Sequence, residues 1–320
     1  MSDAARCATS TLGAALAFGC AVASGQSGMP AVASRAPEGV ASTPATTSLR
    51  MTRARRYTMS GAIRPLLFWV GRDDIGVARV VWRRGDDGAR GYELLIGTDP
   101  ARAPRSLNRW GYIAEDMRGA EWSMLALMTR SDESSYDEAA TGATRGRAAG
   151  DFRAIRARAG DAAATWQVAA VQTPEPLTVH DLGAALDRVG NGTTWAARRE
   201  MRMPSDARPG FLAALAELVD RAVAAREHAD AAQLARARLQ YLFAGQIYEL
   251  KLRRAERGIE PFRNESIPIV RTAFDLHTLA TNARTQFEMT CGTEGALAGV
   301  PLSVSWQPRW WLKVSLTLID

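Results

Sequence analysis

Cysteine and histidine are scarce in this chain of 320 residues, which contains three of each. Two cysteines, Cys7 and Cys20, lie near the N-terminus, so the rest of the chain has only Cys291. A single cysteine allows neither an internal disulfide nor a thiolate metal cluster, and we expect Cys291 to be a buried apolar residue. The histidines have no metal-ligand spacing to one another or to cysteine, so we expect no metal site and no cofactor. They are His180, His228 and His277.

The sequence also lacks several motifs that carry chemistry. It has no glycine-rich phosphate loop and no Gly-x-Ser-x-Gly nucleophile elbow. Arginine greatly outnumbers lysine and the formal net charge is +6, but no run exceeds two consecutive basic residues. Nucleic-acid-binding proteins usually concentrate positive charge on one face or in a recognisable module. We therefore expect no nucleic-acid partner, and a covalent hydrolase is disfavoured.

The N-terminal residues have the pattern of a targeting segment. Arg6 precedes a stretch of small and apolar residues from Cys7 to Ala23, and residues 21–23 fit the small-x-small pattern of a signal-peptidase site. Threonine and serine interrupt this stretch, which makes it a poor membrane anchor. We predict a signal peptide over residues 1–23, a periplasmic or secreted protein, and no transmembrane anchor after cleavage. Lipidation of Cys20 is the minority alternative, because Phe18 fits such a site badly.

The composition divides the remaining chain into a tether and a folded part. Residues 24–48 are rich in Ala, Ser, Thr, Pro and Gly, and residues 50–56 form a short basic run. Such a segment buries too little apolar surface to offset the entropy of ordering it, so we expect a disordered linker over residues 24–56. Residues 57–320 are expected to form one α+β domain, or two subdomains with a break near residues 173–205.

Alternating apolar residues predict many strands. The step Asp86-Asp87-Gly88 predicts a hairpin turn between two of them. The last alternation is the most regular, which indicates that the C-terminus is part of the sheet. The expected strands are Ile63–Val70, Val77–Arg84, Tyr92–Ile96, Glu121–Met128, Phe152–Ala159, Ala164–Val171, Ile267–Phe274, Thr285–Cys291, Val300–Gln307 and Trp310–Ile319.

Helical spacing is confined to a few segments. We expect a short helix after Ser131, a helix from Thr178 to Gly190, and another in which Pro209 occupies the first turn. Residues 230–257 are expected to form a hairpin around Ala244-Gly245, and one long helix is the rival. Strands and helices do not alternate regularly, so we predict an α+β fold: a mostly antiparallel, curled sheet with two or three helices on one face.

Four segments resemble known families. Gly299 to Val314 resembles the closing hairpin of exported bacterial proteins of unknown function that have a curled, lipocalin-like antiparallel sheet. Arg64 to Asp74, Leu95 to Pro100 and Asn108 to Tyr112 are similar to segments of uncharacterised exported bacterial proteins, and this second likeness runs through most of the mature chain. The resemblance implies export and a β-rich fold, and it implies no activity.

Tryptophans and paired carboxylates are the candidates for a site. Asp73 and Asp74 lie between two expected strands and could serve a hydrolase with Glu93, but turn chemistry, with Arg72 as an ion partner, explains adjacent aspartates better. Nine tryptophans are many for this length, and those outside the core could line a cavity or stack on a sugar. Trp310 and Trp311 are consecutive, so on a strand they face opposite ways. The candidate ligand-binding residues are Trp69, Arg72, Asp73, Asp74, Trp110, Trp310 and Trp311.

These observations favour binding over catalysis. We predict an exported, non-enzymatic protein that binds a small apolar or carbohydrate ligand, or a cell-envelope partner, through its curled sheet. The alternatives are an envelope hydrolase that uses Asp73 and Asp74, and a structural envelope assembly protein. Geometry discriminates them: an apolar pocket favours binding, two carboxylates across one cleft favour hydrolysis, and a flat aromatic patch favours assembly.

Overall fold

The computed structural model describes residues 49–64, 68–129, 152–160, 163–191, 193–204, 207–225 and 237–320. The predicted signal peptide, the linker over residues 24–48 and the helix expected after Ser131 lie outside these ranges.

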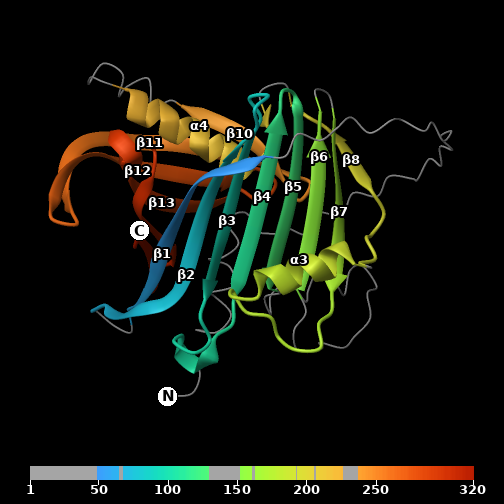
Figure 1. Ribbon diagram of the computed structural model, residues 1–320, viewed down its shortest axis with the longest axis horizontal. Helices are drawn as coiled ribbons and strands as arrows, with labels where there is room; N and C mark the ends of the chain where they lie inside the picture. Colours follow the sequence, from blue (N-terminus) through green and yellow to red (C-terminus); the bar gives the residue numbers. More distant parts are fainter. Residues whose placement is uncertain are drawn as a thin grey trace.

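In the described part of the chain, fifteen strands form one sheet (Figure 1). Its order is β8-β7-β6-β5-β4-β3-β2-β1-β15-β14-β13-β12-β11-β10-β9, and all neighbours are antiparallel except β9 and β10. The strands are β1 (Arg50–Ile63), β2 (Val70–Arg84), β3 (Arg90–Thr98), β4 (Trp110–Arg118), β5 (Glu121–Thr129), β6 (Phe152–Ala159), β7 (Ala163–Val171), β8 (Arg199–Arg202), β9 (Ala207–Arg208), β10 (Arg238–Phe243), β11 (Gln246–Phe262), β12 (Glu265–Thr278), β13 (Ala283–Gly292), β14 (Pro301–Arg309) and β15 (Leu312–Leu318).

The described residues contain two α-helices, α3 (Leu182–Gly190) and α4 (Phe211–Ala224). Helix α4 contacts β3 as well as β9 to β13, so the sheet curls around it. We call the face of the sheet toward α4 the inner face. Helix α3 packs against the opposite, outer face of the strands β4 to β7 (Figure 1).

Alternation along β4 shows how one strand serves both faces. Trp110 and Tyr112 join the outer core with Phe152 of β6 and Leu182 of α3. Ile113 packs on the inner core, and Glu115 reaches the N-terminus of α4. The two faces therefore carry separate cores, of which the inner one is larger.

The predicted fold class was wrong. The protein is mostly β, and the two helices of the described residues lie on opposite faces of one sheet instead of together on one face. Periodicity identifies each hairpin from its own residues. It does not show that successive hairpins continue one sheet, or that the last strand pairs with the first.

Most of the individual elements were predicted correctly. The helix ending at Gly190 is present, and so is the next helix, although Pro209 precedes it instead of occupying its first turn. Residues 238–262 form the hairpin β10-β11 instead of the rival helix. Cys291 is fully buried, as expected.

The start of the sheet differs from the expectation. The strand expected over residues 63–70 is wrong at its two ends, because β1 ends at Ile63 and β2 begins at Val70, and residues 65–67 lie outside the described ranges. Residues 50–56, which we expected in the linker, form the first half of β1. This strand lies between β2 and β15 and pairs with both, for example through Tyr57 opposite Leu318. Residues 50–56 themselves pair with β2 alone, so pairing with a long neighbouring strand orders a basic segment that could not order itself.

Candidate functional site

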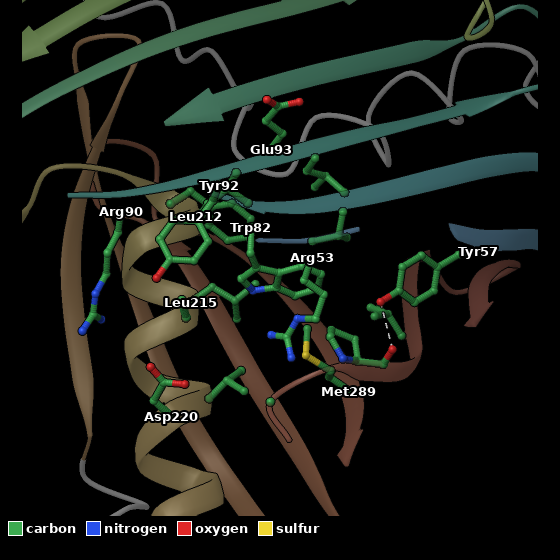
Figure 2. Close-up of a pocket in the computed structure, with 18 of the residues that line it drawn as sticks. Arg53, Tyr57, Trp82, Arg90, Tyr92, Glu93, Leu212, Leu215, Asp220 and Met289 are labelled. Carbon is green, nitrogen blue, oxygen red and sulfur yellow. Dashed lines mark hydrogen bonds between the residues drawn. The ribbon is translucent and has the colours of Figure 1, made fainter. Parts of the chain in front are cut away.

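A cavity of about 210 Å³ lies between α4 and the inner face of the sheet (Figure 2). Its walls come from β1, β2 and β3, from β13, β14 and β15, and from α4. Because the sheet curls around α4, apolar residues from both halves of the chain meet at one place. The apolar lining includes Val80, Leu94, Ile96, Phe211, Leu212, Leu215, Val219, Phe287, Met289, Val304 and Leu316.

Charged side chains gather at one end of this cavity, which we call the mouth. Arg53, Arg84 and Arg90 come from β1, β2 and β3, and Asp220 comes from α4. Figure 2 shows Arg90 and Asp220 next to α4 and Arg53 close to the Trp82 ring. The mouth therefore combines three cations and one carboxylate in front of an apolar interior.

Arg53 is held from two sides. Its guanidinium carbon lies 4.2 Å from the centroid of the Trp82 ring, and its Nη1 donates a 3.1 Å hydrogen bond to the Ala298 carbonyl oxygen. The first contact follows from register, because Arg53 lies opposite Trp82 in the β1-β2 pair. Burial, followed by the charge of Arg55, lowers the pKa of the Arg53 guanidinium. A cation that is partly removed from water gains from a nearby anion.

Asp220 faces the mouth arginines from α4. Desolvation raises the pKa of its carboxyl group, and the charges of Arg90, Arg53 and Arg84 oppose that rise. The raised pKa shows that the arginines do not fully compensate the desolvation of this carboxylate.

Tyr57 lies deeper in the cavity wall. Its hydroxyl group donates a 2.9 Å hydrogen bond to the Pro301 carbonyl oxygen, which Figure 2 shows as a dashed line. The residue is 1% exposed, and burial raises the pKa of the phenol. The hydroxyl proton is thus already used within the protein, and the interior remains a poor site for a polar ligand.

Glu115 fixes the N-terminus of α4 to the sheet. Its Oε1 and Oε2 accept hydrogen bonds of 3.0 Å from the backbone N–H groups of Leu212 and Ala213. The residue is fully buried, and burial raises the pKa of its carboxyl group to about 7, although the two N–H donors lower it. A Cβ atom on Gly210 would lie 2.3 Å from Glu115 Oε2, so only glycine leaves room for the carboxylate.

The C-terminus of α4 is also fixed. Arg257 of β11 donates from Nε to the Ala225 carbonyl oxygen at 2.7 Å and from Nη2 to the Val223 carbonyl oxygen at 2.6 Å. A cation at this end complements the helix dipole, as the carboxylate of Glu115 does at the other end. With both ends held, α4 is a rigid wall of the cavity.

A second hollow, of about 580 Å³, lies over β4 to β7 and is polar. Its side chains are largely engaged with one another. Arg156 donates a 3.0 Å hydrogen bond to Gln167, and its guanidinium carbon lies 4.3 Å from the centroid of the Trp195 ring. Arg198 donates to Thr165 at 3.0 Å. This internal pairing leaves the apolar cavity as the stronger candidate site.

The structure places Trp110 in the outer core instead of a cavity. It is 1% exposed, its Nε1 donates a 2.8 Å hydrogen bond to the Leu177 carbonyl oxygen, and its ring centroid lies 5.6 Å from that of Phe152. These contacts fix the segment before α3 to the sheet, so Trp110 has a structural role.

Trp69 and Trp310 lie at the end of the sheet remote from the mouth. Ile63 pairs with Val70 and with Leu312, which brings the β1-β2 and β14-β15 connections together. The backbone N–H of Arg64 also donates a 2.8 Å hydrogen bond to the Trp311 carbonyl oxygen. Trp311 packs partly on the inner core. We call the exposed apolar residues here the aromatic tip: Ile63, Phe68, Trp69, Val70 and Trp310.

The structure does not bring Glu93 near Asp73 and Asp74. Asp74 accepts a 3.1 Å hydrogen bond from Thr58 and forms an ion pair with Arg102, while Arg72 and Asp73 are exposed at the start of β2. Glu93 lies opposite Val81, seven residues further along β2, which is roughly 20 Å away. It pairs with Arg83 at 3.2 Å, and Figure 2 shows it pointing away from the cavity. A glycosidase needs its carboxylates within about 10 Å of each other.

Sequence reasoning missed the residues of the mouth. The available signal was the alternation along β2, where Val80, Trp82 and Arg84 share one face, and along β3, where Arg90, Tyr92 and Leu94 do. On each strand an apolar stripe ends in an arginine. That pattern becomes meaningful only when the strands are known to be neighbours.

Among the described residues, no group of three or more His, Cys, Asp or Glu side chains is arranged to hold a metal ion. In that same part of the chain, no helix has the length and apolar character needed to cross a membrane.

Comparison with known proteins identifies neither a family nor a function for this chain. No family model and no curated protein matches the sequence. The structure is similar to the crystal structure of a beta-barrel-like protein of domain of unknown function DUF1849 from Brucella abortus. The match has a TM-score of 0.35 and 8% sequence identity, and it covers 85% of this chain and 98% of that chain. At this TM-score we infer neither fold nor function from the likeness.

Proposed function

We propose that this protein binds a small apolar ligand in the cavity between α4 and the inner face of the sheet, without changing the ligand chemically. The observation that carries the proposal is the cavity of about 210 Å³ with its mainly apolar lining. Ligand sites are usually concave and mostly apolar, with a few polar groups that set orientation. A dry cavity of ~150 Å³ can hold benzene, so this one suits a somewhat larger group, such as a substituted ring or a short alkyl chain.

The lining supports binding more than catalysis. Among the described residues that line the cavity there is no histidine, cysteine or serine. Of the two carboxylates in the lining, that of Asp220 lies at the mouth and that of Glu93 points away from the cavity. A carbohydrate fits the interior less well than an apolar ligand, because its hydroxyl groups need partners and Tyr57 already donates to Pro301.

A cavity-filling variant tests this function. Wild-type protein is titrated with the uncharged fluorescent probe N-phenyl-1-naphthylamine, beside Leu215→Trp, which places a larger side chain in the cavity wall. We expect the wild type to bind the probe and Leu215→Trp to bind it at least tenfold more weakly. Leu186→Trp, in α3 on the outer face, is the matched control and should bind like the wild type. Equal binding by all three proteins would contradict the proposal.

Export remains part of the proposal and is supported by residues 1–23. The intact mass of the protein purified from its native host tests it directly. A mass that corresponds to a start at Ser24 is expected, whereas a start at Met1 or Ser2 would remove the exported assignment.

The aromatic tip favours a second function, contact with the surface of an envelope membrane. Phe68 is 61% exposed and Trp310 is 69% exposed, and exposed aromatic residues on neighbouring loops suit the interface between lipid and water. Arg72 beside the tip would complement anionic head groups.

A further inference from the structure

We propose that the ligand of the cavity is an anionic amphiphile, whose charged head group is held by Arg53, Arg84 and Arg90 while its apolar part enters the interior. This inference rests on the proposed function, because it names the class of molecule that the same cavity binds.

The strand register concentrates positive charge at the mouth. Arg84 lies directly opposite Arg50 on β1 and opposite Arg90 on β3. Like charges directly opposite each other destabilise a sheet, and sheets ordinarily pair opposite charges there. Three adjacent strands thus end in arginines that repel one another. A bound anion would remove this repulsion.

The arginines have little compensation within the protein. In the described part of the chain, none of Arg53, Arg84 and Arg90 forms an ion pair with a carboxylate, although other arginines on the same strands do. Arg83, for example, pairs with Glu93 at 3.2 Å and with Asp116 at 2.6 Å. Arg83, the outer-face neighbour of Arg84, is thus neutralised, whereas Arg84 is not.

Arg53 is positioned to bind an anion. The ring of Trp82 and the carbonyl oxygen of Ala298 fix its guanidinium group, and a guanidinium has five N–H donors, so several remain for a ligand. Planar guanidinium groups bind carboxylate and phosphate oxygens in pairs. Preorganisation by Trp82 reduces the entropy that binding costs.

Asp220 is the opposing charge at the mouth. It acts on Arg90, Arg53 and Arg84 together, and no described arginine forms an ion pair with it. A carboxylate at this point repels an anionic head group. The proposal therefore makes two predictions of opposite sign: removal of the arginines weakens binding of an anion, and removal of the Asp220 charge strengthens it.

A series of ligands with one tail tests the head group. Binding of octanoate, octyl phosphate, octan-1-ol and octylammonium is measured by displacement of N-phenyl-1-naphthylamine. We expect at least one of the two anions to bind at least tenfold more tightly than octan-1-ol, and octylammonium to bind more weakly than the alcohol. The comparison of octanoate with octyl phosphate identifies which head group the mouth prefers.

Variants of the charged residues test whether the preference for anions arises at the mouth. The double variant Arg84→Gln with Arg90→Gln should reduce the preference for the anions to less than threefold, and Asp220→Asn should increase it. Arg253→Gln with Arg254→Gln on β11 removes the same charge away from the cavity and should leave the preference unchanged. Arg84 and Arg90 are exposed, and thermal unfolding confirms that the variants fold.

The outcomes separate the two proposals. If no ligand of the series displaces the probe and the probe itself does not bind, the cavity has no such function. If octan-1-ol binds as tightly as the anions, the cavity binds apolar ligands and the inference about the head group is wrong. If both double variants lose the preference equally, net charge alone explains it, which also overturns the inference.

Discussion

The two ends of β1, β2 and β3 present opposite kinds of surface. At one end, Arg53, Arg84 and Arg90 surround the mouth of the cavity. At the other end, roughly 30 Å away along β1, the aromatic tip exposes Phe68 and Trp310 to solvent. The same strands connect them, so neither strand propensity nor sheet geometry explains the difference.

Each end destabilises the isolated molecule. Arginines opposite one another repel, and exposed aromatic side chains order water without any packing in return. Such destabilising features are explained if a binding partner removes the charge repulsion at one end and covers the aromatic side chains at the other. The partner that fits the mouth is a small anion with an apolar part, and the partner that fits the tip is an extended apolar surface. The comparison implies that the two ends act independently, which the following variants test.

The largest expected effect is a pH dependence that belongs to the cavity end. The carboxyl group of Glu115 has its pKa raised from 4.5 to about 7 in the folded protein. Its contribution to stability is therefore complete below pH 4.5 and is lost as the pH rises through 7. At 1.36 kcal/mol per pKa unit, the free energy of unfolding should fall by about 3 kcal/mol across this range.

Urea denaturation of the wild type and Glu115→Gln at pH 4.5, 6 and 8 measures how the free energy of unfolding changes with pH in each protein. Glutamine cannot titrate, so the variant should lose the component due to Glu115 and show a flatter profile. Identical profiles would mean that Glu115 is not the group responsible. The tip should be unaffected, with the same Trp69 and Trp310 accessibility to a fluorescence quencher at each pH.

A smaller effect is expected from glycine-to-alanine changes in the two helical regions. Gly210→Ala places a Cβ 2.3 Å from Glu115 Oε2 and should destabilise the protein by about 2 kcal/mol and weaken probe binding, because α4 must shift. Gly183→Ala, in α3, meets no atom within 4 Å and should stabilise the protein by roughly 0.5 kcal/mol. Thermal unfolding of both variants measures these two changes in stability. Equal effects would show that α4 is not constrained by Glu115.

The smallest effect on stability is expected at the tip. Trp310→Ser should change the free energy of unfolding by less than about 0.5 kcal/mol, because the side chain is 69% exposed. It should nevertheless reduce flotation with vesicles that contain phosphatidylglycerol. Ile259→Ser on β11, where the side chain is 71% exposed, is the matched control and should float like the wild type. Unchanged flotation of Trp310→Ser would remove the membrane function from the tip.

Local structure could be predicted from this sequence because its signals are local. The alternation in residues 238–252 identified a hairpin in a segment where a long helix was the rival, and Pro209 marked the start of α4. Thr178 begins the turn that precedes α3, where its backbone N–H and hydroxyl group donate hydrogen bonds of 2.8 and 2.7 Å to Asp181.

Global features could not be predicted in the same way. Residues 50–56 are ordered because they pair with the end of β2, and their composition does not reveal that partner. The placement of α4 inside the curl depends on Glu115, whose inward position on β4 does not distinguish it in the sequence from the neighbouring Asp116. The abundance of tryptophan suggested Trp110 and Trp310 as site residues, whereas the tryptophan that lines the cavity is Trp82. Nothing in the sequence distinguishes Trp82 from other strand residues until its neighbouring strands are known.

The pairing of β1 with β15 has a consequence for how the chain folds. Most other neighbouring strands are joined by short connections and can pair as soon as both are synthesised. The β1-β15 pair instead joins residues from opposite ends of the described chain, and contacts of such sequence separation are slow to form. The two halves of the meander can therefore form early as separate curved sheets. The cavity, whose wall crosses this seam, should be the last part of the protein to be completed.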